Sequence, residues 1–182
     1  MKLYAFPPSP NARKVAAVVA HLHLTDVEYV LVKLHKGKHR RPDFLAIDPM
    51  GKVPVLCDGD LILWESNAIF QYLAKRAGDT SFFPADPKIR ASIARWLFWE
   101  AGTWSPVIDV FTDENVRKPM LGIGTADLKR VADAEERFRP LAKLLNDQLA
   151  ERKFLLGDSV TLADFCRRRG RHLRGTWPNS NH

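Results

Sequence analysis

Residues 49–69, PMGKVPVLCDGDLILWESNAI, decide the fold. Apolar residues occupy 53–56 and 61–63, and the Asp-Gly-Asp sequence at 58–60 is typical of a tight turn between two strands. Residues 65–77 then carry apolar side chains at helical spacing and are followed by a glycine, which commonly ends a helix. The stretch therefore predicts a β-hairpin followed by a helix.

The residues before this stretch predict a second α/β unit. Residues 2–6 have the pattern of a short strand, and three prolines between positions 7 and 10 interrupt it. Valines and a leucine at 15, 18, 19 and 22 form one face of a helix, and residues 27–34 are apolar on both faces, as in a buried strand with a parallel neighbour. A basic loop, residues 36–41, follows. The order βαβ then ββα predicts an α/β domain over residues 1–78.

Only helices are predicted beyond this domain. Residues 79–87 are rich in Pro, Asp and small residues, which indicates a linker with Phe82 and Phe83 as an apolar anchor. Residues 88–165 predict an all-α domain, in which Pro140 should kink or split the second long helix. The expected buried stripe of that helix consists of Leu128, Val131, Phe138, Leu141, Ala142, Leu145 and Leu149.

The positive charge is concentrated at the C-terminus. The chain has 28 Lys and Arg against 21 Asp and Glu, a formal charge of +7. Five arginines lie in residues 166–182, which contain no acid, so the remainder carries +2. A basic nucleic-acid surface on the folded part is therefore not expected.

Composition also limits the location of the protein and its chemistry. No stretch approaches the roughly 20 apolar residues of a membrane span, and the first residues lack a signal-peptide pattern. We expect a cytoplasmic protein without membrane contact. Cys57 and Cys166 are too far apart in sequence for a CxxC pair, and the histidines lack ligand spacing, so neither a disulfide framework nor a metal site is predicted.

Three motifs occur in order on the expected elements. They are Ser9-Pro10-Asn11-Ala12-Arg13 before the first helix, Lys52-Val53-Pro54 before the hairpin and Glu65-Ser66 at the start of the third helix. Together with the βαβ-ββα order, they resemble the soluble glutathione transferases, and most closely serine-type, theta- and phi-like members of bacterial origin. The resemblance covers residues 1 to about 165. It implies a thioredoxin-like N-terminal domain, a cis-proline at Pro54, a homodimer and an enzyme of detoxification.

The resemblance implies that Ser9 is the catalytic residue. Glutathione reacts as its thiolate, and a free thiol with a pKa near roughly 8.5 is mostly protonated at neutral pH. A hydroxyl at a helix N-terminus could donate to the thiolate, and the helix dipole would favour the anion. The alternative is that Ser9 only caps the helix. Asn11 and Arg13 would orient this turn.

The remaining implied contacts hold the rest of the tripeptide. The backbone of Val53 before Pro54 would pair with it like an added strand, and Glu65 and Ser66 would bind its γ-glutamyl end, or else cap the helix. The glycyl carboxylate would be neutralised by the basic residues His39, Arg40 and Lys52, which are otherwise solvated loop residues.

Small hydrophobic electrophiles are the implied second substrates. Phe6, Trp104 and Phe111 are candidates to line their pocket, although aromatic residues at helical spacing also form cores. Cys57 is interpreted as a small buried hydrophobic residue and not as a nucleophile. Glutathione would be a co-substrate, and no cofactor is expected.

The C-terminus departs from the family pattern. Thr161 to Asp164 form a capping-box sequence that resembles the start of the family's buried central helix. The arginines of residues 166–182 cannot occupy a dry helix, because each unpaired buried charge costs several kcal/mol. We therefore expect an incomplete helical domain, truncated or frame-shifted, with an atypical basic tail. The alternative function is a non-catalytic module for glutathione binding or dimerisation, and nucleic-acid binding through the tail is a third possibility.

Overall fold

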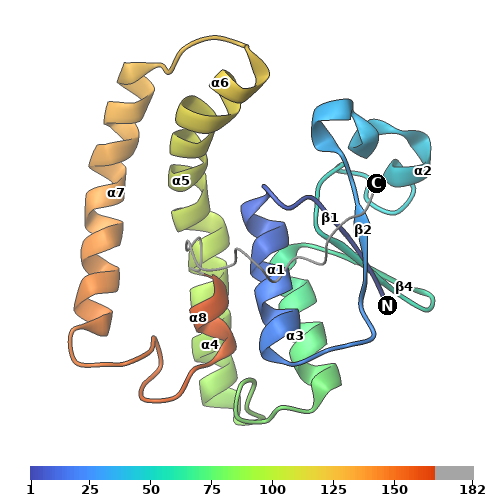
Figure 1. The fold of residues 1–182 in the computed structure, drawn as a ribbon. Coiled ribbons are helices and arrows are strands. Elements are labelled where there is room, and N and C mark those ends of the chain that lie inside the picture. The colour runs from blue at the N-terminus through green and yellow to red at the C-terminus, as the bar shows by residue number, and fades with distance from the viewer. Residues whose placement is uncertain (167–182) are drawn as a thin grey trace. The chain divides into compact units, whose positions relative to one another are not determined.

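The computed structural model describes residues 1–166 and contains two compact units (Figure 1). Among the described residues, the first unit consists of Met1–Ala85 together with Phe165 and Cys166, and the second is Asp86–Asp164. Residues 79–85 of the expected linker thus belong to the first unit, where Phe82 and Phe83 are buried. Within residues 1–166, no helix combines the length and apolar composition that a membrane span requires.

The first unit has the predicted βαβ-ββα order. Its four strands form one sheet in the order β2-β1-β3-β4, with β1 parallel to β2 and antiparallel to β3, and β3 antiparallel to β4. The elements are β1 (Lys2–Ala5), α1 (Pro10–His21), β2 (Glu28–Leu31), the 3-10 turns η1 (Leu34–Lys36) and η2 (Lys38–Arg40), α2 (Pro42–Leu45), β3 (Val55–Asp58), β4 (Leu61–Trp64) and α3 (Ser66–Ala77).

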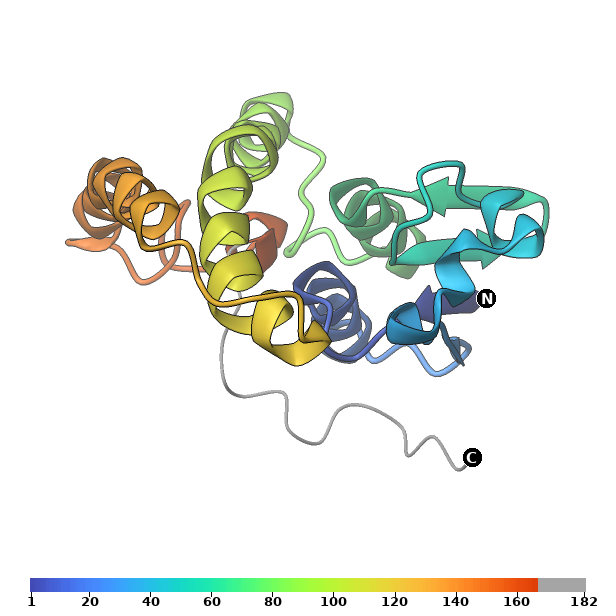
Figure 2. The ribbon, with the colours of Figure 1, turned by 90° about the horizontal axis from the view of Figure 1, so that it is seen from above.

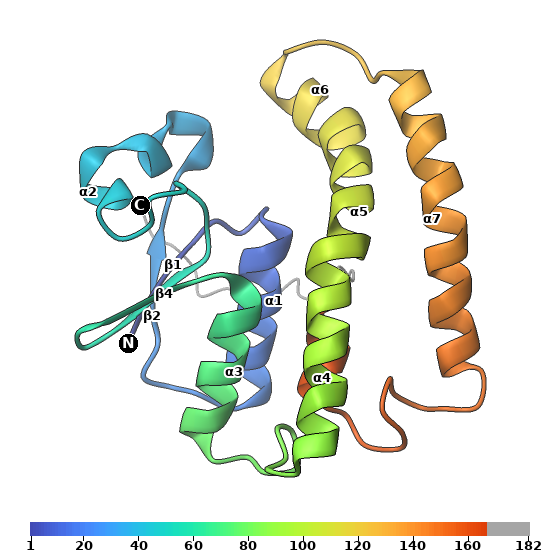
Figure 3. The same ribbon diagram turned by 180° about the vertical axis from the view of Figure 1, so that it is seen from behind.

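The sheet is covered on both faces. Helices α1 and α3 lie side by side on one side of it and α2 lies on the other (Figures 1 and 3). Because side chains alternate along a strand, Leu3 and Ala5 of β1 are fully buried on one face, while Tyr4 packs on the other against Val32 and Phe44. Apolar packing on both faces of the sheet therefore holds β1 and β3 in place. The candidate site lies beside the C-terminal end of β1 and the N-terminal end of β3.

All four strands differ from their predicted bounds, β1 and β4 by one residue at their ends and β2 and β3 by more. Strand β2 ends at Leu31 and not at residue 34, because the chain turns into η1 and then through Gly37, whose φ is +67°. Strand β3 begins at Val55 and not at residue 53, since Pro54 has no N–H to donate to the ladder. The predicted hairpin turn is confirmed, because Asp58 pairs with Leu61.

The second unit is helical. From α4 to α6 the chain remains helical, with two π-helical turns at η3 and η4, and α7 packs beside α5 (Figures 1 and 2). The elements are α4 (Pro87–Trp99), η3 (Glu100–Trp104), α5 (Ser105–Thr112), η4 (Asp113–Arg117), α6 (Lys118–Leu121), α7 (Leu128–Leu149) and the start of α8 (Leu162–Cys166), whose last two residues belong to the first unit.

Helix α7 bears on two predictions. The helix continues through Pro140, so the predicted split is wrong, while the predicted kink stays a prediction. Pro140 and Glu136, whose carbonyl loses its helical partner, are both exposed, so water can satisfy that carbonyl. The expected stripe is only partly buried: Leu145 is 4% exposed, whereas Leu128, at the first position of the helix, is 79% exposed.

The capping sequence before α8 forms the predicted kind of contact. The carboxylate of Asp164 accepts hydrogen bonds from the backbone N–H of Thr161 and of Leu155, both at 2.9 Å. Phe165 packs against His21 and Phe82, with ring centroids 5.0 and 5.2 Å away. The arginines of the predicted basic tail lie outside the described residues.

Candidate active site

A small pocket in the first unit brings together six of the predicted glutathione-binding residues. Its volume is about 30 Å³. Ser9, His39 and Arg40 are not among its lining residues, whereas Asp48, Met50 and Trp64, which the sequence analysis did not select, are. The predicted residues that line it are Asn11, Lys52, Val53, Pro54, Glu65 and Ser66. We call it the Ser66 pocket.

Ser9 is the N-cap of α1, two residues before Asn11. Its hydroxyl oxygen accepts a hydrogen bond from the Ala12 N–H at 3.4 Å, and its backbone is extended. The capping alternative is therefore present in the structure. It does not exclude a second role, because a hydroxyl that accepts from the backbone still has its own proton to donate.

Asp48 organises the loop that supplies one wall of the pocket. The side chain is 1% exposed, and its two oxygens accept hydrogen bonds from Met50 N–H at 3.1 Å and Lys52 N–H at 2.5 Å. A buried carboxylate that accepts two backbone N–H groups fixes the path of the loop. The sequence offered a signal for this role, since Asp before Pro and Gly is typical of a turn.

Gly51 is the point at which this loop packs against the predicted basic residues His39 and Arg40. Its φ is +62°, and a Cβ placed on it would lie 2.8 Å from the His39 carbonyl oxygen and 3.2 Å from Arg40 Nη1. Only glycine fits such an approach without displacing backbone. His39 and Arg40 therefore lie against the residue next to Lys52, although they do not line the Ser66 pocket.

His39 was predicted to contribute positive charge to the basic loop, but its environment favours the neutral imidazole. Partial burial, and then the positive charge of Arg40, lower the pKa of His39 below its usual value. The imidazole is therefore mainly neutral at pH 7. Its Nδ1 is buried without a hydrogen-bond partner among residues 1–166. The fixed positive charges in this region are those of Arg40 and Lys52.

The Val53-Pro54 peptide bond is cis, as the resemblance implied. Within the described residues, the Val53 N–H and C=O take part in no hydrogen bond. Val53 precedes the first ladder residue, Val55, and its backbone lies at the pocket wall. An extended backbone with open N–H and C=O groups can accept a peptide as an added strand.

Glu65 and Ser66 form the opposite wall. Glu65 has φ +71° and ψ +113°, a conformation that is strained for any residue other than glycine. Its side chain is exposed and makes no capping hydrogen bond, so the capping alternative is wrong for Glu65. Ser66 is buried at the first position of α3, where the N–H groups of the first turn point outward.

The proposed electrophile residues are distributed over the two units. Phe6 belongs to the first unit, where its ring lies 5.8 Å from that of His35. Trp104 and Phe111 belong to the second, where both rings contact Phe138, at 5.3 and 6.0 Å. Ring contacts also join Trp104 to Trp99, and Trp99 to Trp96, so these five aromatic side chains of the second unit form a connected series.

Cys57 occupies the position expected of a hydrophobic residue. It packs against the cluster of Val32, Phe44 and Val55, and burial raises the pKa of its thiol. A raised pKa reduces the thiolate fraction at neutral pH, which makes a nucleophilic role unfavourable. No group of three His, Cys, Asp or Glu side chains suited to a metal ion occurs within residues 1–166.

Comparison with known proteins gives consistent matches. Residues 1–75 match the family model of the glutathione S-transferase N-terminal domain. A glutathione S-transferase of Hyoscyamus muticus is 39% identical over 166 residues, which are 90% of this chain and 77% of that protein. Glutathione S-transferase 3 of Zea mays is 37% identical over 90% of this chain and 73% of its own length.

The solved structures agree. Glutathione transferase F7 from Populus trichocarpa superposes with a TM-score of 0.84 at 30% identity, over 91% of this chain and 78% of that one. Glutathione S-transferase-I bound with lactoylglutathione gives a TM-score of 0.81 at 30% identity over the same shares. The predicted fold, a thioredoxin-like domain followed by a helical domain, is confirmed, and the chain belongs to the glutathione S-transferase family of enzymes.

Proposed function

We propose that the chain conjugates the glutathione thiolate to small hydrophobic electrophiles, with Ser9 stabilising the thiolate and no metal or prosthetic group. The thiol proton passes to water, the sulfur attacks the electrophilic carbon, and the leaving group departs. The observation that carries the proposal is the position of the Ser9 hydroxyl. It lies at the N-terminus of the 12-residue helix α1, two residues in sequence before Asn11, which lines the Ser66 pocket. A hydroxyl donor and a helix N-terminus both favour an adjacent anion.

The tripeptide would be held at three points. Glu65 would bind the α-ammonium group, since its carboxylate is exposed at the pocket wall without a capping partner. Ser66 and the first N–H groups of α3 would bind the α-carboxylate, and the open backbone of Val53 would pair with the central residue. Asn11 would complete the wall beside Ser9.

The glycyl carboxylate would lie toward the basic loop. Lys52 and Arg40 would supply charge, and His39, which its lowered pKa keeps neutral, would supply a hydrogen bond. Phe6, Trp104 and Phe111 remain our candidates for the electrophile pocket. A homodimer also remains a proposal, supported by the exposed Ile62 and Trp64 on β4, each 45% accessible.

The test compares two lost helix caps. Ser9→Ala should lower turnover with 1-chloro-2,4-dinitrobenzene by about 100- to 1000-fold, as when one donor to a reacting anion is removed. The dissociation constant of glutathione by calorimetry should change little. Asp86→Ala is the matched control, because Asp86 caps α4 by accepting from Ile89 N–H at 2.9 Å. It should lose similar stability, about 1 kcal/mol, with normal turnover.

The same experiment separates the rival function. A wild-type chain that binds glutathione without conjugating it would be the non-catalytic module. Turnover by Ser9→Ala equal to that of the wild type would exclude the proposed role of the hydroxyl.

A further inference from the structure

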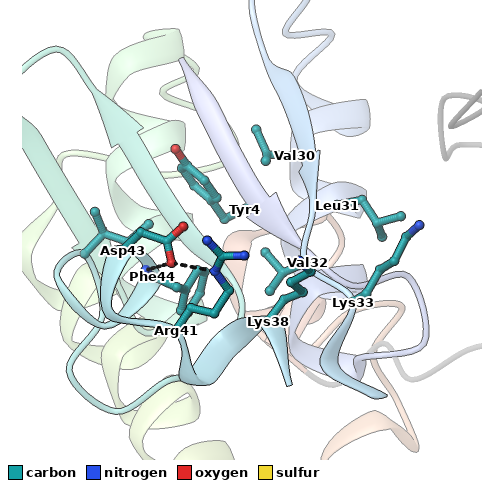
Figure 4. A pocket seen from close by; sticks show the side chains of 10 residues that line it. Tyr4, Val30, Leu31, Val32, Lys33, Lys38, Arg41, Asp43 and Phe44 are labelled. Atoms are coloured by element: carbon teal, nitrogen blue, oxygen red, sulfur yellow. Dashed lines mark hydrogen bonds and ion pairs between the residues drawn. The ribbon is translucent and has the colours of Figure 1, made fainter. Parts of the chain in front are cut away.

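An open groove of about 480 Å³ lies beside β2 in the first unit (Figure 4). It is separate from the Ser66 pocket, with which it shares no lining residue. Its volume is within the range of ligand-binding clefts. The residues that line this β2 groove are Tyr4, Val30, Leu31, Val32, Lys33, Lys38, Arg41, Asp43, Phe44 and Ile47.

The backbone of β2 is open on this side. Strand β2 is at the edge of the sheet. The N–H groups of Glu28 and of Val32, the residue after β2, donate to the carbonyl oxygens of Met1, just before β1, and of Ala5, both at 2.9 Å. Since successive residues of a strand alternate in direction, Leu31 and Lys33 direct their N–H groups away from β1. Neither N–H has a hydrogen-bond partner within residues 1–166.

The groove combines an apolar floor with a positive rim. Tyr4, Val30, Val32 and Phe44 form the floor, since they lie on the same face of the sheet or on α2 below it. The rim carries three cations, Lys33, Lys38 and Arg41, and one acid, Asp43. The acid is already engaged by Arg41 Nε at 3.2 Å and by the Phe44 N–H at 3.1 Å, as Figure 4 shows.

The two lysines remain available for a partner. In the part of the chain that the structure describes, neither Lys33 nor Lys38 forms an ion pair, so both charges are uncompensated. The open groups are distributed from Leu31, at the end of β2, through the 3-10 turns that follow it, and they do not converge on one point. Such a distribution suits an extended chain better than a compact anion.

We propose that the β2 groove binds an extended peptide segment in which carboxylate and aliphatic side chains alternate. The peptide would add a strand to the edge of the sheet and accept hydrogen bonds from the N–H groups of Leu31 and Lys33. Alternate side chains of a strand point to opposite faces, so the aliphatic ones would contact the floor and the carboxylates would meet Lys33 and Lys38. The inference is independent of the proposed conjugation reaction.

Three probes separate strand addition from simple charge attraction. All three are end-blocked peptides labelled with fluorescein. The first alternates glutamate and valine, and the second alternates lysine and valine. The third has the sequence of the first, with every second backbone nitrogen methylated. We expect the full chain to bind the first about tenfold or more tightly than either of the others, by fluorescence anisotropy at low salt. Equal binding of the methylated peptide would overturn strand addition, and equal binding of the lysine peptide would overturn the charge argument.

A pair of double variants locates the site. Lys33→Gln with Lys38→Gln should weaken binding of the glutamate peptide about 3- to 10-fold, since both charges are solvent-accessible. The control, Lys36→Gln with Lys75→Gln, has the same net charge and changes exposed lysines outside the groove. It should stay within about twofold of the wild type. An equal loss in both double variants, or no loss in the first, would overturn the assignment to the β2 groove.

Discussion

Glu65 is held in a backbone conformation that costs stability. Its φ of +71° and ψ of +113° lie in a region that is unfavourable for residues with a Cβ, and its carboxylate makes no capping hydrogen bond that would compensate. Replacement by glycine removes both the strain and the proposed ligand for the α-ammonium group. We therefore expect Glu65→Gly to stabilise the protein and to weaken glutathione binding.

The magnitude follows from two opposing terms. A residue in such a region costs about 1–3 kcal/mol, whereas the extra freedom of glycine in the unfolded chain costs about 0.5–1 kcal/mol. The net gain of up to about 2 kcal/mol corresponds to a rise of up to about 4–8 °C in the thermal midpoint for a chain of this length. Loss of a charge-assisted hydrogen bond should raise the dissociation constant of glutathione about 10- to 100-fold.

Glu65→Ala is the matched variant. It removes the carboxylate but keeps a Cβ, so it should weaken glutathione binding as much as Glu65→Gly without raising the thermal midpoint. Scanning calorimetry gives the thermal midpoint of each variant, and glutathione titration gives its dissociation constant. A midpoint for Glu65→Gly at or below that of Glu65→Ala would refute the strain argument. Wild-type glutathione affinity in Glu65→Ala would refute the binding role.

Three further outcomes are expected. Ser9→Cys should form a mixed disulfide by exchange with glutathione disulfide, releasing one molecule of glutathione, because a thiol at a helix N-terminus gains thiolate character; mass spectrometry would detect the adduct. Gly51→Ala should destabilise the protein by about 1–3 kcal/mol in denaturant titrations and weaken glutathione binding, since its Cβ would lie 2.8 Å from the His39 carbonyl oxygen. The hydrogen bond from the Asp127 N–H, and then the charges of Lys118 and Arg130, lower the pKa of the buried Glu114 carboxyl group. The stability that ionised Glu114 gives to the folded protein is therefore fully present above about pH 5 and is lost as the pH falls. Glu114→Gln should therefore lower the thermal midpoint at pH 7, with a difference from wild type that shrinks in acid.

The first unit could be predicted because local signals and long-range pairing agree there. The hairpin follows from the turn at 58–60, and α3 ends at Gly78, whose φ is +72°. The end of β2 could not be predicted, because residues 32–34 continue the apolar pattern while the backbone already enters η1. The continuity of α7 through Pro140 could not be predicted either. It depends on whether the Glu136 carbonyl is exposed to water, and the sequence does not give the exposure of one carbonyl on a long helix.

The candidate site was predictable where its residues belong to a local motif. Lys52, Val53 and Pro54 occur together, as do Glu65 and Ser66, and the structure places both groups at one pocket. Trp64 was missed because the strand pattern does not tell which of its residues borders the pocket. The contact of Gly51 with His39 and Arg40 depends on two loops meeting in space, which spacing along the chain does not encode.

Several energetically unfavourable features lie at the Ser66 pocket and in the loop beside it. Glu65 is strained, the Val53 backbone groups are open, and a buried nitrogen of His39 has no partner within residues 1–166. Each feature alone would lower the stability of the unit, and none is required by the packing of the sheet. A peptide with an ammonium group, an amide backbone and a terminal carboxylate offers a partner for the Glu65 carboxylate, for the Val53 backbone and for His39. The occurrence of these features at the Ser66 pocket and in the loop beside it is what selection for binding, and not for stability, would produce.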